Sequence, residues 1–333
     1  MKKLIKKTLK TLLPLLLGGC ILVWIYKDFD FSQVKQTLLH EMNWWWMLVS
    51  LFFGVMSHVF RGWRWKMTLK AMDAYPKTSN CVNAVFVSYA ANLILPRVGE
   101  VSRCGILSKY DGVSFSKSLG TVVSERMIDA LCVLLITAVA MLTQMKVFTR
   151  FFAATGTDID SVTGIFTSMH FYIILLSAIG VAVLLYYLVR TLSFFEKVKG
   201  VVLNVWEGFT SLRKVKNMPL FILYTILIWG CYFLQFYITF FCFSFSAGLS
   251  LLAGLVMFVG GSLAVIVPTP NGAGPWHFAV ISMMMLYGVG ASDAGTFALI
   301  VHGIQTLLVI LLGVYGLLAL PIINKKSIIY EDN

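Results

Sequence analysis

The chain has 333 residues, of which 59% are hydrophobic and only 13% are charged, and its formal net charge is +12. Soluble domains carry roughly 45–50% apolar and about 25% charged residues, so this composition excludes a soluble protein and indicates a membrane protein. Because the lysines and arginines stand in short clusters between apolar runs, the basic charge favours an anionic membrane surface as the partner and not nucleic acid.

The first half of the chain predicts three spans around one shorter apolar segment. The elements expected in chain order are a retained first span at Thr11–Tyr26, a surface amphipathic helix at Asp30–His40, a second span from Trp44 to Phe60, a short segment at Cys81–Leu95 and a span at Leu119–Met145. Trp44–Trp46 is typical of an interfacial belt, and Arg61–Lys66 is expected to anchor the second span at the opposite surface.

The second half predicts the same kinds of element. They are a span at Phe166–Val189, a basic amphipathic helix at Arg190–Lys216, a span at Leu220–Phe243, two shorter apolar segments at Leu251–Val267 and Trp276–Tyr287, and a last span at Thr296–Leu320. The chain ends thirteen residues after Leu320, so we expect one integral membrane domain over 1–333 with no soluble catalytic domain attached.

Two stretches interrupt the apolar sequence with proline and glycine. The first break is Asn92–Arg103, sequence NLILPRVGEVSR, and the second is Pro268–Pro275, sequence PTPNGAGP. Lipid cannot satisfy the backbone N–H and C=O groups that such breaks release, so non-helical backbone at membrane depth must line a cavity or be buried in protein. The two breaks are therefore the expected functional site.

Basic residues set the expected topology. With both termini in the cytoplasm, 22 of the 27 lysines and arginines fall on the inner side. This assignment requires Cys81–Lys117 to enter and leave from the inside, and it allows Leu251–Gly290 to enter and leave from the outside. The fold class expected is thus an all-α polytopic membrane protein with about six spans and two re-entrant helical hairpins, its halves 1–145 and 166–320 forming an inverted repeat. Eight ordinary spans are the alternative.

Charged residues near the first break suit an anionic lipid. Arg97 and Arg103 stand three residues on either side of Glu100, so one helical turn would place a carboxylate between two guanidinium groups that bind phosphate. A structural ion-pair cluster is the alternative. Glu125, Arg126 and Asp129 lie on one helix face, so Arg126 can pair with Asp129. The second carboxylate of this trio is expected to pair with Arg97 or Arg103 or to carry a proton.

At the second break, Pro270, Gly272 and Gly274 open a helix whose free N–H groups are candidates to bind phosphate. A tight turn without ligand is the alternative. Trp276 and His277 are expected to anchor this turn. The six cysteines form no CxxC pair, and the five histidines are scattered, so we predict no metal site, no cofactor and no catalytic residue.

The two breaks, Asn92–Arg103 and Pro268–His277, together with Ser124–Asp129, resemble the flippase-like membrane domain of lysylphosphatidylglycerol synthases. In bifunctional members that domain precedes a soluble domain that transfers lysine from lysyl-tRNA to phosphatidylglycerol, and it moves the product lipid to the outer leaflet. The resemblance implies a stand-alone bacterial or archaeal inner-membrane protein. Asn271 and Pro275 depart from the small residues usual in the second motif.

The expected function is therefore lipid translocation without ATP, since no P-loop is present. The substrate-binding residues expected are Asn92, Arg97, Glu100, Arg103, Glu125, Arg126, Asp129, Pro270, Gly272, Gly274, Trp276 and His277. The partner is a membrane phospholipid, with a homo-oligomer or a separate lipid-modifying enzyme as a further partner. The alternatives are an integral-membrane enzyme acting on a lipid headgroup, with Glu125 or Asp129 as base, and a membrane subunit of a separate lipid synthase.

Overall fold

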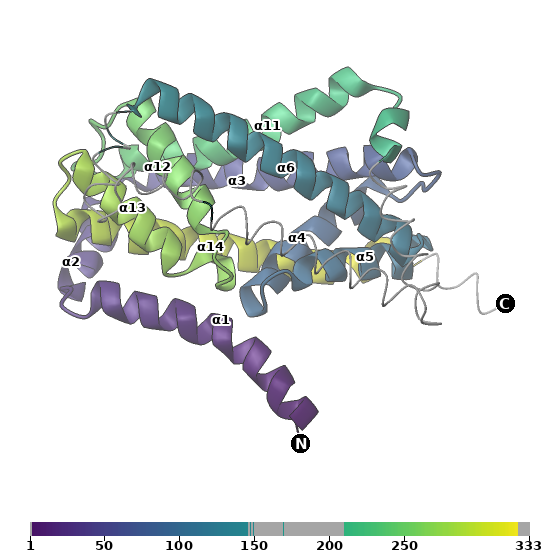
Figure 1. Ribbon diagram of the computed structural model, residues 1–333, viewed down its shortest axis with the longest axis horizontal. Helices are drawn as coiled ribbons and strands as arrows, with labels where there is room; N and C mark the ends of the chain where they lie inside the picture. Colours follow the sequence, from purple (N-terminus) through teal and green to yellow (C-terminus); the bar gives the residue numbers. More distant parts are fainter. Residues whose placement is uncertain (1, 146, 148, 150–168, 170–209, 326–333) are drawn as a thin grey trace.

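The computed structural model describes residues 2–145, 147, 149, 169 and 210–325 (Figure 1). All regular structure within these residues is helical. The helices are α1 (Lys2–Tyr26), α2 (Phe31–Gln36), α3 (Trp44–Lys70), α4 (Thr78–Ile94), α5 (Val98–Asp111), α6 (Phe115–Thr143), α11 (Met218–Ile238), α12 (Leu251–Ala264), α13 (Pro275–Leu286) and α14 (Ala291–Ile323), with short turns η1 (Thr37–Glu41), η2 (Ser211–Lys214), η3 (Thr239–Cys242) and η4 (Pro270–Gly272).

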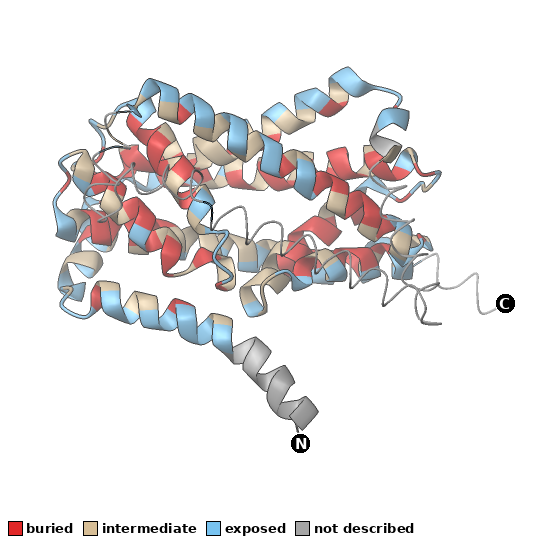
Figure 2. Cartoon of the chain, viewed as in Figure 1, coloured by how far each residue is buried: buried red, intermediate tan, exposed pale blue. Residues whose placement is uncertain are grey.

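Long helices with apolar outer faces confirm an all-α membrane protein. Three of the described helical stretches are long and apolar enough to cross a bilayer, namely Phe115–Thr143, Met218–Cys242 and Ala291–Ile323. The leucines on the outer face of α6 show what surrounds the protein: Leu131, Leu134, Leu135 and Leu142 are 60–79% exposed. Such a surface is stable in lipid and would aggregate in water. Figure 2 shows the same pattern, with exposed residues along the outer face of α6.

Two helical hairpins lie between the long helices. The helices α4 and α5 pack against each other, as do α12 and α13, and the two pairs lie toward opposite ends of the molecule's long axis in Figure 1. At 1.5 Å per residue, the longest of these four helices, α4 with 17 residues, is only about 25 Å long. A bilayer core is about 30 Å thick, so each of these helices is shorter than the core, and the re-entrant course of the two hairpins stays a prediction.

Local sequence explains the turn in the first hairpin. Pro96 restricts Leu95 to extended backbone, with φ −146° and ψ 123°, and Arg97 then takes the left-handed conformation, with φ 68°. The side chain of Asn92 accepts a hydrogen bond from the Gly99 N–H at 2.7 Å, which caps the start of α5. Gly99 is required because a Cβ there would collide with the carbonyl oxygen of Ser88 on α4.

The second hairpin turns through residues with positive φ. Asn271, Gly272 and Gly274 have φ values of 51°, 72° and 92°. Pro275 then begins α13, a position where a missing N–H is harmless and the fixed φ of proline favours a helix. Helix α4 also contacts η4, so the first hairpin lies against the turn of the second.

Each hairpin belongs to its own buried core. One cluster gathers apolar residues of the first hairpin with the end of α3, including Trp65, Leu69, Val85 and Leu107. A larger cluster gathers the second hairpin with α11 and α14, and it includes Phe240, Met257, Met284, Phe297 and Val301.

Several predicted bounds are corrected by the structure. The second span does not end at Phe60, because α3 continues to Lys70 and buries Arg61, Arg64 and Trp65. The predicted surface helix at Asp30–His40 divides into α2 and the π-helical turn η1. The helices that contain the first and last predicted spans extend beyond them, since α1 begins at Lys2 and α14 at Ala291.

The predicted span Phe166–Val189 and nearly all of the predicted amphipathic helix Arg190–Lys216 lie outside the described residues. The inverted repeat of halves 1–145 and 166–320 therefore stays a prediction.

Candidate functional site

The centre of the candidate site is a pair of arginines that share one carboxylate. Arg61 and Arg64 stand three residues apart on α3, and Asp129 faces them from α6. Arg61 Nη1 lies 2.6 Å from Asp129 Oδ2, and Arg64 Nη2 lies 2.9 Å from Asp129 Oδ1. Both guanidinium groups are at most 2% exposed, so Asp129 binds two cations inside the protein.

A third buried arginine joins from the first hairpin. Arg103 on α5 lies with Nη1 2.8 Å from Glu125 Oε2, and the Glu125 side chain is fully buried. The guanidinium also stacks over the ring of Trp65, with Cζ 4.6 Å from the ring centroid, and the Trp65 indole donates a hydrogen bond to Thr121 at 2.9 Å. The pairing of Arg103 with Glu125 thus fixes α5 against α6 and α3.

Arg126 completes the group at the protein surface. Its Nη2 lies 3.6 Å from Asp129 Oδ2, and its side chain is 44% exposed. We call Arg61, Arg64, Arg103, Arg126, Glu125 and Asp129 the buried cation network. Four guanidinium groups share two carboxylates in this network, which leaves two formal positive charges in excess.

Several polar atoms of the buried cation network have no hydrogen-bond partner in the described part of the chain. Among the described residues, Arg64 Nε, Arg103 Nε and Arg103 Nη2 have no hydrogen-bond partner, and neither do the two carboxylate oxygens of Glu125. Burying a cation away from water is costly unless it is paired and its protons are bonded. An anion that approached these groups would therefore gain charge-assisted hydrogen bonds that the protein alone does not make.

Polar side chains from other helices support the network. Arg64 Nη1 donates to the hydroxyl of Thr225 on α11 at 3.2 Å, and Arg61 Nε donates to Tyr232 at 3.4 Å. The Tyr232 hydroxyl lies 2.8 Å from that of Tyr89 on α4. Since α4 also contacts η4, this helix lies between the network and the second break.

An apolar groove lies beside the network. A cavity of about 370 Å³ is lined by residues of α6, α11 and α12, including Cys132, Ile136, Trp229 and Phe233. Thr225, which accepts the hydrogen bond from Arg64, also lines this groove. Cys132 stands one helical turn after Asp129 on α6. The groove therefore places an apolar surface, which suits an acyl chain, next to the hydrogen-bond partner of the buried Arg64.

The predicted cluster at the first break is wrong in part. Arg97 is exposed, and no ion pair joins Glu100 to Arg97 or Arg103 within the described part of the chain. Left-handed backbone at Arg97 disrupts the single helical turn that the three-residue spacing presumed. Asn92 is engaged as a cap of α5. The predicted pair of Arg126 with Asp129 and the predicted reception of Arg103 by Glu125 are both confirmed.

The second break is packed against α1. A Cβ on Gly274 would meet Ile21 Cβ at 2.9 Å and the Gly18 carbonyl oxygen at 3.0 Å. The Gly274 N–H already points to His277 Nδ1 at 3.4 Å. The start of α13 is thus covered beside Gly274, which leaves no room for phosphate at that position. The opening at Pro270 and Gly272 stays untested as a ligand contact.

Trp276 and His277 anchor this turn as predicted. The ring centroids of His277 and His302 are 4.5 Å apart, and those of Trp276 and His302 are 5.2 Å apart. His302 Nε2 lies 3.1 Å from the Asn271 carbonyl oxygen, and the Asn271 amide donates to Thr306 at 2.9 Å. These contacts tie the turn to α14.

Arg61 and Arg64 are the residues that sequence reasoning missed. The alternation of basic and aromatic residues there predicts interfacial anchors. A signal was present, since Arg61, Arg64 and Trp65 fall on one helical face while Trp63 and Lys66 do not. Tyr89, Thr225 and Tyr232 carry no such signal.

The helices and the site define a polytopic membrane protein with two broken-helix hairpins and buried charges. A family profile described as the lysylphosphatidylglycerol synthase TM region matches residues 11–313. The chain therefore belongs to this family, which gives it a lipid-related role in a membrane. Neither the curated proteins nor the solved structures gave a match.

Proposed function

We propose that the protein carries a lipid with a phosphate headgroup between the two leaflets. The observation that carries this proposal is the meeting of an apolar groove with the buried cation network. An acyl chain suits the groove between α6, α11 and α12, and a phosphate suits guanidinium groups whose protons are incompletely bonded. Both contacts bind the lipid without a chemical change in it.

The state of the carboxylates supports the carrier over an enzyme. Glu125 and Asp129 were the candidate bases, and each lies within 2.9 Å of a buried guanidinium group. The role of both carboxylates here is to hold the arginines in place beside Thr225, which lines the groove.

Transport in proteoliposomes tests the proposal. The groove offers a matched pair of substitutions, because Gly230 on α11 and Gly303 on α14 are both exposed helical glycines with open space around them. Only Gly230 lines the groove. Both substitutions to leucine should fold, since glycine is roughly 0.8–1.0 kcal/mol less favourable than alanine in a helix and leucine ranks next to alanine.

We expect Gly230→Leu to slow the movement of labelled phosphatidylglycerol at least about tenfold, whereas Gly303→Leu leaves it unchanged. Arg126→Gln should also slow transport, because it removes the exposed cation of the network, while Arg97→Gln should not. Equal rates in all four variants would overturn the proposed path. Recovery of lipid with an altered headgroup would show an enzyme instead.

We further infer a bacterial or archaeal inner-membrane protein with both termini in the cytoplasm. Three of the 22 basic residues counted on the inner side are buried in the network, and the remaining 19 still far exceed the four in the outer loops. In a variant without native cysteines, single cysteines beside Lys77 and beside Lys109 should both be protected from an impermeant reagent added outside. Labelling of only one would mean that α4 crosses the membrane alone.

A further inference from the structure

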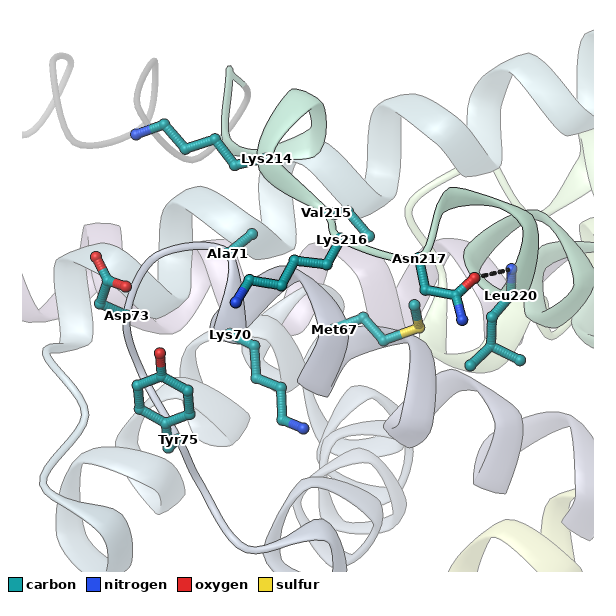
Figure 3. A pocket seen from close by; sticks show the side chains of 10 residues that line it. All are labelled: Met67, Lys70, Ala71, Asp73, Tyr75, Lys214, Val215, Lys216, Asn217 and Leu220. Atoms are coloured by element: carbon teal, nitrogen blue, oxygen red, sulfur yellow. Dashed lines mark hydrogen bonds between the residues drawn. The ribbon is translucent and has the colours of Figure 1, made fainter.

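A basic cavity lies where α3 ends and α11 begins. Its volume is about 550 Å³, and its walls come from the end of α3, the link to α4, and the segment that leads from η2 into α11. Figure 3 shows Lys216 extending from that segment toward Lys70 and Ala71 on the facing wall. The cavity is thus built from two parts of the chain that are about 145 residues apart.

The lining combines positive charge with apolar surface. Lys70, Lys214 and Lys216 line the cavity together with a single acid, Asp73. Within the described residues no ion pair engages any of these three lysines. Apolar side chains, including Met67 and Leu220, form another part of the lining. Lysines alone would suit free phosphate, whereas lysines beside an apolar wall suit a phosphate that is attached to acyl chains.

The cavity lies one helical turn from the buried cation network. Met67 follows Arg64 by three residues on α3, which is about 4.5 Å along the helix axis. On α11, Leu220 is followed directly by Phe221, whose ring centroid lies 5.8 Å from the Arg64 guanidinium carbon. Asn217 caps α11 at the cavity wall, and the positive end of that helix dipole also favours an anion.

We infer that this cavity binds the headgroup of an anionic phospholipid and that lipid passes from it to the buried cation network. The second part rests on the proposed function, whereas the binding itself does not. The three lysines attract the headgroup from the membrane surface, and the adjacent Arg64 offers the next cation along α3. This gives the protein a preference for anionic lipids before transport begins.

Binding of labelled lipid tests the site apart from transport. The probe is phosphatidylglycerol with a fluorescent acyl chain, titrated into the purified full-length protein in a zwitterionic detergent. The test variant replaces Lys70, Lys214 and Lys216 with glutamine. The matched control replaces Lys35, Lys109 and Lys117, which are exposed or partly exposed lysines elsewhere on the chain, so both variants lose three positive charges.

We expect the test variant to bind phosphatidylglycerol at least about tenfold more weakly, and the control variant and the binding of labelled phosphatidylcholine to be unchanged. Equal losses in the two variants would show only general surface charge and would overturn the site. Displacement by millimolar inorganic phosphate would show a free-phosphate site instead of a lipid site. If the test variant alone loses binding while no transport is seen in the parent, the site stands and the translocase proposal fails.

Discussion

The partner of Arg103 is the sharpest point at which the structure can be tested. Two glutamates compete for this role: Glu100 stands three residues before Arg103 on the same helix, and Glu125 faces it from α6. Only Glu125 lies within ion-pair distance, at 2.8 Å. The substitutions Glu100→Gln and Glu125→Gln change the same atoms and remove the same charge, so each controls for the other.

The cost of Glu125→Gln follows from its burial. The carboxylate is fully buried, with Arg103 Nη1 at 2.8 Å and Arg64 Nε at 3.8 Å. Unit charges about 4 Å apart attract by about 4 kcal/mol at an effective dielectric constant near 20. Removing one member of a buried pair costs about 3–5 kcal/mol, because the other charge stays buried without its partner. We expect a loss of stability in this range.

Glu100→Gln should change stability by less than about 1 kcal/mol, because no described cation pairs with Glu100. Thermal unfolding in detergent with a thiol-reactive dye measures the difference. In a background that keeps only Cys81 and Cys104, which are fully buried beside the network, the dye reports on opening of the first hairpin. Equal melting temperatures for the two variants, or a larger drop for Glu100→Gln, would refute the assignment of the pair.

Two further predictions concern the first hairpin and the start of α2. Gly99→Ala should destabilise the hairpin by about 1–3 kcal/mol through overpacking. Gly105 lies on the same helix with open space around it, so Gly105→Ala should stabilise α5 by up to about 1 kcal/mol. The same dye assay measures both changes. Hydrogen bonds from Ser32 hold the pKa of the exposed Asp30 carboxyl below its ordinary value, so Asp30 supports the start of α2 at neutral pH and loses that effect as the pH falls through its lowered pKa. The protection of the α2 amides against exchange, measured relative to their intrinsic exchange rate at each pH, should therefore fall only in strong acid, and a fall in protection already at pH 5–6 would contradict this cap.

Local sequence determined the breaks in the helices. Pro96 excludes helical backbone at Leu95, and the prolines and glycines of Pro268–Pro275 do the same at the second break, whatever surrounds them. The membrane class likewise follows from composition, because no soluble core can bury so much apolar surface. The pair of Arg126 with Asp129 was predictable because residues three apart on a helix are neighbours.

Tertiary structure decided which charges meet. Basic and aromatic residues at the end of a span are typical of an interfacial anchor. Arg61, Arg64 and Trp65 show the same sequence pattern although they are buried against α6. The two cases differ only in whether another helix carries acids at the same depth, and Asp129 does so from 68 residues away.

At the first break, too, the spacing of charges in the sequence does not show which charges pair. A three-residue spacing places Glu100 and Arg103 on one face of α5, but a side chain pairs with the nearest opposite charge that packing offers. Glu125 offers that charge inside the protein, where water cannot screen it. Sequence therefore determined where the two breaks fall and that charges enter the membrane. The packing of α3, α5 and α6 decided the partner of each charge, because pairing energy depends on distance in space and on burial.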